Sequence, residues 1–468
     1  MLNKIPLNYL IAAFIFVAIF VFYISANTKL RKQRAVDVQQ IDRRSRFAGA
    51  ETWREAHSED LIDEIRNVID QEGMPVNVFA DDRKPKERNV DDPTNIAVTL
   101  HHLFQEYYPQ DPEKPNDLQK LWDASPAGAW DVDEQVLHDM HAILVKFEPK
   151  RQTVRKMLLE ETTRFNYMFN QRDTKSIMSV QPAVNTEASK YLADYALLEE
   201  YAVAQALLDG NIIEATNALW YIFHLAHVAS KLGNVGVRSD VALMRLQTYE
   251  VMQRVVLDPK FEKSDMVFLR DMLAERQEKW ISEYDTWFGD RASGMVLYHH
   301  VMMNGVVNAF TPEELALVQN RANIDAVMRG FRAHHEEDKT FYLESMQRIL
   351  NVSKKPFVKR QDVLKRIKKE LSDMESTYDE NGLPSEHFVA YVLLKDIDRL
   401  MQIFAQDQSA LNRAVVVMHR SLGQSNTDSY HDPFTDEPYE VRKVKGMWNV
   451  SATMLPRDFQ VPDFTNKE

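Results

Sequence analysis

Two apolar stripes with helical spacing follow each other in the centre of the chain. The first runs from Tyr191 to Leu208, and the second recurs between Ala215 and Ala229. Apolar residues at this spacing predict one buried face on each helix. The stretch 209–211 (Asp-Gly-Asn) separates them, and Gly and Asn tolerate the left-handed conformation that ends a helix. The pattern predicts an antiparallel helical hairpin with Ala-lined faces, followed by a third helix from about Ser239.

Shorter apolar stripes predict further helices on both sides of this hairpin. The clearest start signal is at Thr311, where Thr, Pro and Glu stand in the order of a capping box. The predicted helices cover residues 58–69, 92–107, 132–147, 152–169, 261–288, 290–307, 385–404 and 413–422, with another from Thr311.

The period of the pattern changes near the end of the chain. Apolar and polar residues alternate in 439–444 and 447–452, around Lys445-Gly446. Such alternation around a two-residue turn with Gly predicts a β-hairpin. The last dozen residues are predicted to be loop. The fold class is therefore mainly α, with an irregular helical-hairpin body and a small C-terminal β-hairpin.

Residues 6–25 carry no charged side chain, and about twenty apolar residues match one helical crossing of a bilayer. A transmembrane anchor is the main interpretation, and a cleaved signal peptide ending near Ser25-Ala26 is the alternative. Basic residues such as Lys29 and Arg31 follow the span, and only Lys4 precedes it, which favours a cytoplasmic body. The sequence thus predicts a single-pass protein of the cytoplasmic (inner) membrane.

Six segments follow from these patterns. They are an anchor (1–27), a charged linker with one short helix (28–91), an N-terminal helical region (92–180), the central helical-hairpin body (181–350), a basic helix with C-terminal helices (351–422) and a turn-rich tail (423–468).

Composition excludes several classes of protein. The 468 residues include no Cys, which removes disulfides, Cys-ligated zinc, iron–sulfur clusters and thiol catalysis. The formal net charge of −13 argues against a general nucleic-acid binder. Phosphate-binding Gly motifs and the Gly-x-Ser-x-Gly elbow are absent. The sequence predicts no cofactor.

Four stretches together resemble a family of membrane-anchored helical proteins found in planctomycete bacteria. These are Asn95-Ile96-Ala97, the central hairpin, FGDRASG at 288–294 as a helix start, and the DPF-T/S-G-x-P-like element at 432–438. Asp436 stands where that family usually has Gly. The resemblance implies architecture and no activity, and it favours a body outside the cytoplasm, as does the lack of Cys. The side of the membrane therefore stays open.

Two partial likenesses accompany this one. The tail is also similar to the end of type II secretion pseudopilins, although the body is too long and too helical for one of them. The central hairpin looks like a tetratricopeptide unit, but the 34-residue repeat does not recur in register.

Two His pairs are the candidates for metal binding. His138 and His141, and likewise His224 and His227, lie three residues apart, so each pair can share one helix face. Glu-x-x-His and His-Glu-x-x-His are both absent, so packing competes with ligation at each pair. Glu160-Glu161 and Glu199-Glu200 are interpreted as solvated helix faces.

One basic cluster is a candidate for lipid binding. Its solvent-side residues are Lys365, Arg366, Lys368 and Lys369. A basic amphipathic helix can dock on anionic lipid, and it can equally be an ordinary surface helix that offsets acidic neighbours. The leading functional hypothesis is a membrane-anchored interaction or scaffold protein with an unidentified protein partner and no nucleic acid. The alternative is a metal-dependent enzyme that uses the paired His residues.

Overall fold

The computed structural model describes nine ranges of the chain. These are residues 94–104, 117–124, 134–165, 181–231, 235–279, 282–304, 321–375, 387–425 and 429–465. The predicted membrane span, the helix at 58–69 and the start signal at Thr311 lie outside these ranges. Within them, no helix is long and apolar enough to cross a membrane.

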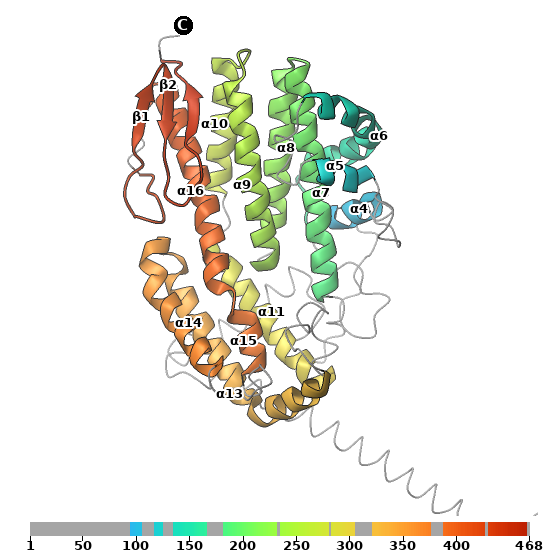
Figure 1. Cartoon of the computed structure of the whole chain (residues 1–468), viewed down its shortest axis with the longest axis vertical. Coiled ribbons are helices and arrows are strands. Elements are labelled where there is room, and N and C mark those ends of the chain that lie inside the picture. The colour runs from blue at the N-terminus through green and yellow to red at the C-terminus, as the bar shows by residue number, and fades with distance from the viewer. Residues whose placement is uncertain are drawn as a thin grey trace, which may run out of the picture.

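Long helices running side by side build the upper body (Figure 1), and a small antiparallel sheet lies beside them. The helices are α4 (Ile96–Phe104), α5 (Asp117–Ala124), α6 (Glu134–Leu158), α7 (Gln181–Leu208), α8 (Ile212–Ser230), α9 (Val235–Leu257), α10 (Lys263–Glu278), α11 (Glu283–Asn304), α13 (Arg321–Ser353), the 3-10 turn η6 (Phe357–Arg360), α14 (Gln361–Glu375), α15 (Phe388–Leu394) and α16 (Ile397–Ser421). The mainly α fold class with a small C-terminal sheet is confirmed.

The predicted central hairpin is confirmed as α7 and α8. Gly210 has a φ of 68°, the left-handed conformation that Gly adopts without cost. The side chain of Asn211 accepts a hydrogen bond of 3.1 Å from the backbone N–H of Glu214 and so caps α8. The third helix, α9, begins at Val235, four residues earlier than predicted.

The helices predicted at 132–147 and 152–169 are one helix, so that prediction was wrong. Pro149 lies inside α6, and the helix continues past it to Leu158. A turn follows, in which the hydroxyl of Thr163 donates a hydrogen bond to the carbonyl of Met157. Phe147, Val154 and Leu158 are buried on the same helix, so packing on both sides of Pro149 holds α6 together.

The boundary predicted near Asp290 was also misplaced. The backbone N–H of Asp285 donates to the hydroxyl oxygen of Ser282 at 3.1 Å, and α11 begins at Glu283. The FGDRASG stretch consequently lies inside α11 and starts no helix. Gly294 in this stretch allows the Tyr342 ring to pack closely, since a Cβ there would lie 2.1 Å from the Tyr342 hydroxyl.

The helix boundaries predicted after residue 385, at 385–404 and 413–422, were also misplaced. The helix is interrupted at residues 395–396. A single long helix, α16, then takes the place of the short helix predicted at 413–422. Asp338 on α13 fixes the start of α15, because its carboxylate accepts hydrogen bonds from the N–H groups of Val389 and Ala390 at 3.0 and 2.8 Å. This cap is distant in sequence, so local spacing did not predict it.

The predicted β-hairpin is confirmed as β1 (Val441–Val444) and β2 (Met447–Val450), with positive φ angles at Lys445 and Gly446. The predicted loop at the end of the chain was wrong, since β3 (Phe459–Pro462) pairs antiparallel with β2. Phe459 and Val461 are buried against the helices, and this burial explains why the strand forms.

Candidate functional site

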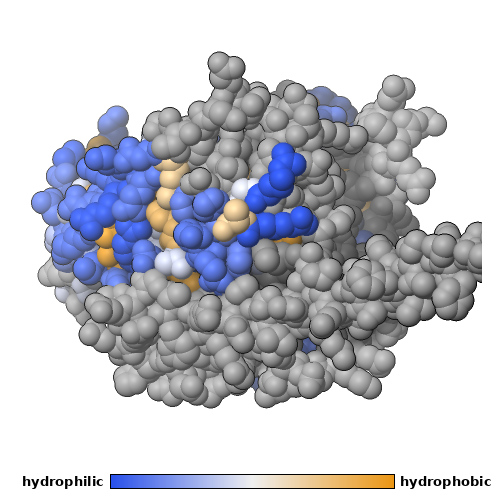
Figure 2. All heavy atoms as spheres, turned by 90° about the horizontal axis from the view of Figure 1, so that it is seen from below, coloured by the Kyte–Doolittle hydropathy of each residue, from blue (hydrophilic) through white to orange (hydrophobic). Residues whose placement is uncertain are grey.

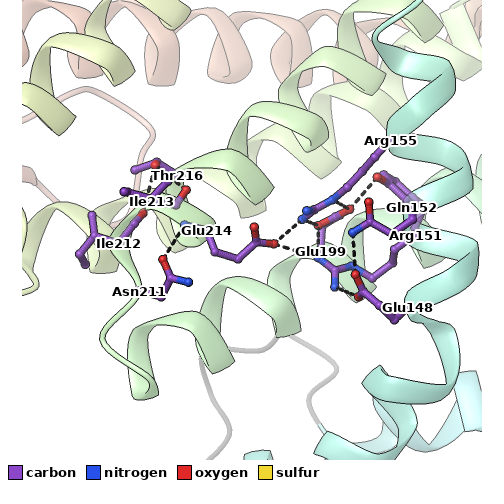
Figure 3. Close-up of polar contacts among 11 residues, drawn as sticks. Glu148, Arg151, Gln152, Arg155, Glu199, Asn211, Ile212, Ile213, Glu214 and Thr216 are labelled. Atoms are coloured by element: carbon purple, nitrogen blue, oxygen red, sulfur yellow. Dashed lines mark hydrogen bonds and ion pairs between the residues drawn. The ribbon is translucent and has the colours of Figure 1, made fainter.

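A buried ion-pair cluster joins α6, α7 and α8 (Figure 3). Glu199 is fully buried and accepts hydrogen bonds from Arg155 at 2.8 and 2.6 Å and from Arg151 at 2.9 Å. Glu214 lies 2.9 Å from Arg155, and the hydroxyl of Tyr195 donates to Glu199 at 2.6 Å. We call this set the Glu199 cluster.

The Glu199 cluster overturns the interpretation of Glu199-Glu200 as a solvated face. Both residues are buried, and Gln247 on α9 donates a hydrogen bond of 2.6 Å to Glu200. Burial raises the pKa of Glu199, but the charges of Arg151 and Arg155 outweigh it and hold the pKa below its ordinary value. Glu160-Glu161 is exposed as predicted, although it lies in the turn after α6.

A second buried ion pair joins α9 to α16. Arg245 donates to Asp407 from Nε at 3.0 Å and from Nη2 at 2.5 Å. Arg238 lies farther away, with its Nη2 3.9 Å from the same carboxylate. All three side chains are buried, so this bidentate contact fixes the position of α16 against α9.

A small cavity lies next to this pair, among α8, α9, α10 and α16. Its volume is about 10 Å³, and its polar lining consists of His227, Ser230, Arg245, Tyr249 and Arg276. We call this set the Arg276 cavity. A space of this size admits one particle as large as a water molecule. The cavity is too small for an organic substrate.

The polar groups of the Arg276 cavity are incompletely paired. The hydroxyl of Tyr249 is buried without a hydrogen-bond partner, and so is Nε of Arg276. The Arg276 guanidinium lies over the ring of Trp220, 5.6 Å from its centroid. Burial lowers the pKa of Arg276, and the neighbouring Glu275 offsets only part of this effect.

His227 lines this cavity, and the ring of His224 lies near it, with the two ring centroids 6.3 Å apart. Burial, with the positive charges of Lys231 and Arg276, lowers the pKa of His227 to about 3. Burial and Arg276 also lower the pKa of His224 to about 4. Both rings are therefore neutral at pH 7, and the cations beside them repel a metal ion.

The other His pair faces solvent on α6. His138 and His141 are exposed, and His138 lies 3.9 Å from Glu134 one turn earlier. In the described part of the chain, no group of three or more His, Asp and Glu side chains could hold a metal ion. Neither pair gains a third ligand from these described residues.

The basic helix is α14, and its four candidate residues Lys365, Arg366, Lys368 and Lys369 are all exposed. Leu364, Ile367 and Leu371 face the core. Figure 2 views the molecule from its lower end, where α13 and α14 lie, and most of the described surface there is hydrophilic with a narrow hydrophobic stripe. Lys368 lies 3.4 Å from Asp398, so one of the four cations is partly offset.

The DPF element folds around Asp432. Its carboxylate accepts hydrogen bonds from the N–H groups of Phe434 and Thr453 at 3.0 and 2.8 Å, and Phe434 packs against Phe357 of η6. Asp436 has a φ of 64°. This is the left-handed conformation, which Gly adopts most readily and Asp tolerates.

The sequence matches no family model, and neither a curated protein nor a solved structure matches it.

Proposed function

We propose that the protein is a membrane-anchored helical scaffold that holds a protein partner at one end of its bundle. The observation that carries the proposal is a group of exposed apolar side chains at that end. Ile213 at the start of α8 is 70% exposed, and Leu159 after α6 is 64% exposed. Leu208 and Leu257, at the ends of α7 and α9, are 38% and 39% exposed. Large exposed apolar side chains that gather on one surface mark interaction sites.

Contacts between the element ends support their common location. The turn after α7 lies against the turn after α9, since a Cβ on Gly210 would meet the side chain of Lys260. Both turns lie at the upper end of the bundle in Figure 1. The ion pair between Arg155 and Glu214 brings the end of α6 to the start of α8. We call the four apolar residues the upper patch.

The surroundings of the upper patch indicate the chemistry of the partner. Glu160 and Glu161 follow Leu159, and Asp209 follows Leu208; all three are exposed. These acidic side chains beside an apolar centre suit a partner segment with an apolar face and basic flanks, and Lys260 is a cation at the same end. Membrane anchoring and the existence of a protein partner are both part of what we propose.

A crosslinking experiment with matched variants tests the scaffold function. Full-length protein carrying Ile213→Glu is compared with Leu243→Glu, a control that places the same charge on an exposed position of α9. Leu243 lies about 20 Å along the helix axis from Leu257. We expect Ile213→Glu to lose at least one reproducible partner that the wild type and Leu243→Glu both retain. Identical crosslinked products from all three proteins would contradict the proposal.

Docking of α14 on anionic lipid is a second candidate, because all four candidate cations are exposed. Each basic residue near an anionic membrane contributes about 1 kcal/mol, so four Gln substitutions are expected to weaken liposome binding by two orders of magnitude or more. The measurement is co-sedimentation of the variant K365Q/R366Q/K368Q/K369Q with vesicles that contain phosphatidylserine. Unchanged binding would assign α14 to ordinary surface packing.

A further inference from the structure

The Arg276 cavity is enclosed by four helices, and its lining is unusual for a buried space. The polar lining residues come from α8, α9 and α10, and Phe223, Leu273 and Leu411 supply apolar walls. Tyr249, Arg276 and Ser230 are each at most 5% exposed. Bulk water therefore solvates these side chains very little, and the cavity must satisfy them from within.

Two of the lining groups are hydrogen-bond donors that lack a partner. The Tyr249 hydroxyl is buried with none, and Nε of Arg276 is likewise unpaired. In the described part of the chain, no carboxylate lies within ion-pair distance of the Arg276 guanidinium, whereas the neighbouring Arg245 binds Asp407. Leaving a buried donor unpaired costs about 1–3 kcal/mol, and more when the donor is charged.

The charge around the cavity is positive. Arg245 and Asp407 neutralise each other, and Arg276 on α10 adds a further cation to the lining. Lys231 at the end of α8 is near enough to depress the pKa of His227, together with Arg276 and Arg245. Buried charges in proteins are paired or bind an ion. The unpaired Nε of Arg276 is a donor on a charged group, so a negatively charged acceptor would pair with it most strongly.

We propose that the Arg276 cavity binds one small monovalent anion, a chloride ion, held by the Arg276 guanidinium and the Tyr249 hydroxyl. The volume of about 10 Å³ limits the occupant to one monatomic ion or one water molecule and excludes phosphate or an organic carboxylate. A metal cation is disfavoured by the same charges that attract chloride. A water molecule fits the space, but it cannot neutralise Arg276.

Chloride binding makes the stability of the bundle depend on the anion. A ligand that binds only the folded protein raises the melting temperature, and above the Kd this rise continues with the logarithm of the ligand concentration. This inference is independent of the scaffold function, because the cavity lies inside the bundle and the upper patch lies on its surface.

The test is thermal unfolding of full-length protein in sodium chloride and in sodium gluconate at equal ionic strength. We expect chloride to raise the melting temperature by about 1–2 °C for each tenfold increase above its Kd, with bromide acting like chloride and gluconate having no effect. Crystals grown in bromide are expected to show one anomalous peak between Arg276 and Tyr249. Equal melting curves in chloride and gluconate, or a bromide-free cavity, overturn the proposal.

Variants separate the site from a general salt effect. Tyr249→Phe removes only the unpaired hydroxyl, so we expect it to weaken chloride binding severalfold while the melting temperature in gluconate stays the same. Arg276→Gln is expected to abolish the chloride dependence. The control is Arg270→Gln on the same helix, because Arg270 binds Asp271 at the surface and should leave the chloride dependence intact. A chloride dependence that survives both Tyr249→Phe and Arg276→Gln contradicts the assignment.

Discussion

The Glu199 cluster and the Arg276 cavity are two buried polar regions that both contain Arg and Tyr side chains. They differ in whether carboxylates accompany the guanidinium groups. In the first, two guanidinium groups meet Glu199, Glu214 and Glu148, and the donors are arranged around carboxylate oxygens. In the second, Arg276 and Tyr249 face a space to which the described residues contribute no carboxylate. A buried cluster whose guanidinium groups are paired with carboxylates holds helices together, whereas a buried guanidinium group without such a pair has capacity to bind an anion.

The strongest test of this comparison removes the central carboxylate. Glu199→Ala leaves Arg151 and Arg155 buried without their shared partner, so we expect the free energy of unfolding to fall by about 3–5 kcal/mol. Urea denaturation measures the change. Glu160→Ala, at an exposed position after α6, serves as the control and should change stability by less than about 0.5 kcal/mol. A small loss for Glu199→Ala would mean that water reaches the cluster.

A matched pair of tyrosines sharpens the comparison. The hydroxyl of Tyr195 donates to the charged Glu199, so Tyr195→Phe is expected to cost about 1.5–3 kcal/mol. The hydroxyl of Tyr249 has no partner, so Tyr249→Phe should be neutral in chloride-free buffer. Denaturation of both variants in gluconate measures the two values. Equal losses would show that Tyr249 has a partner in solution.

The two regions should also respond to acid in different pH ranges. His227 is neutral when folded, with a pKa near 3, so its contribution to stability is complete above its unfolded pKa of about 6.5 and is lost as the pH falls below it. At pH 5 this loss is about 2 kcal/mol. Glu199 has a lowered pKa, so its contribution is lost only below the ordinary carboxyl range.

Denaturation at pH 7.5 and pH 5 measures this difference. We expect His227→Gln to reduce the loss of stability between the two pH values by about 2 kcal/mol relative to wild type. Burial raises the pKa of Asp338 to about 7, which makes stability fall as the pH rises through the same range. Both proteins share that effect, so it cancels in the comparison. If His227→Gln and the wild type lost the same stability between pH 7.5 and pH 5, His227 would be solvated.

The smallest expected effect has the opposite sign. Arg276→Met keeps an apolar chain over Trp220 and removes a buried cation that no carboxylate pairs, so we expect stability in gluconate to rise by about 1 kcal/mol. The same substitution should remove the gain from chloride. Urea denaturation in each salt provides both values, and a clear loss of stability in gluconate would contradict the absence of a partner for Arg276.

Local signals in the sequence determined the short-range parts of this fold. The turn at Gly210 and Asn211 depends on backbone freedom and on a side-chain cap three residues away, and the turn at Lys445-Gly446 links adjacent strands. Such turns depend only on neighbouring residues, so the local sequence pattern was sufficient to predict them. The exposed cations of α14 were predicted for the same reason, since helical spacing alone separates Lys365 from Leu364.

The tertiary structure decided which charged residues became buried. Glu199 looks like a surface residue until α6 brings Arg151 and Arg155 to it from more than forty positions earlier in the chain. Asp407 pairs with Arg245 across 162 positions, and β3 forms because β2 and the helices cover it. Arg276 and Tyr249 meet only when α9 and α10 pack around one cavity. A charge is stabilised by whatever lies within a few ångströms of it, and distances between remote parts of a chain are set by packing.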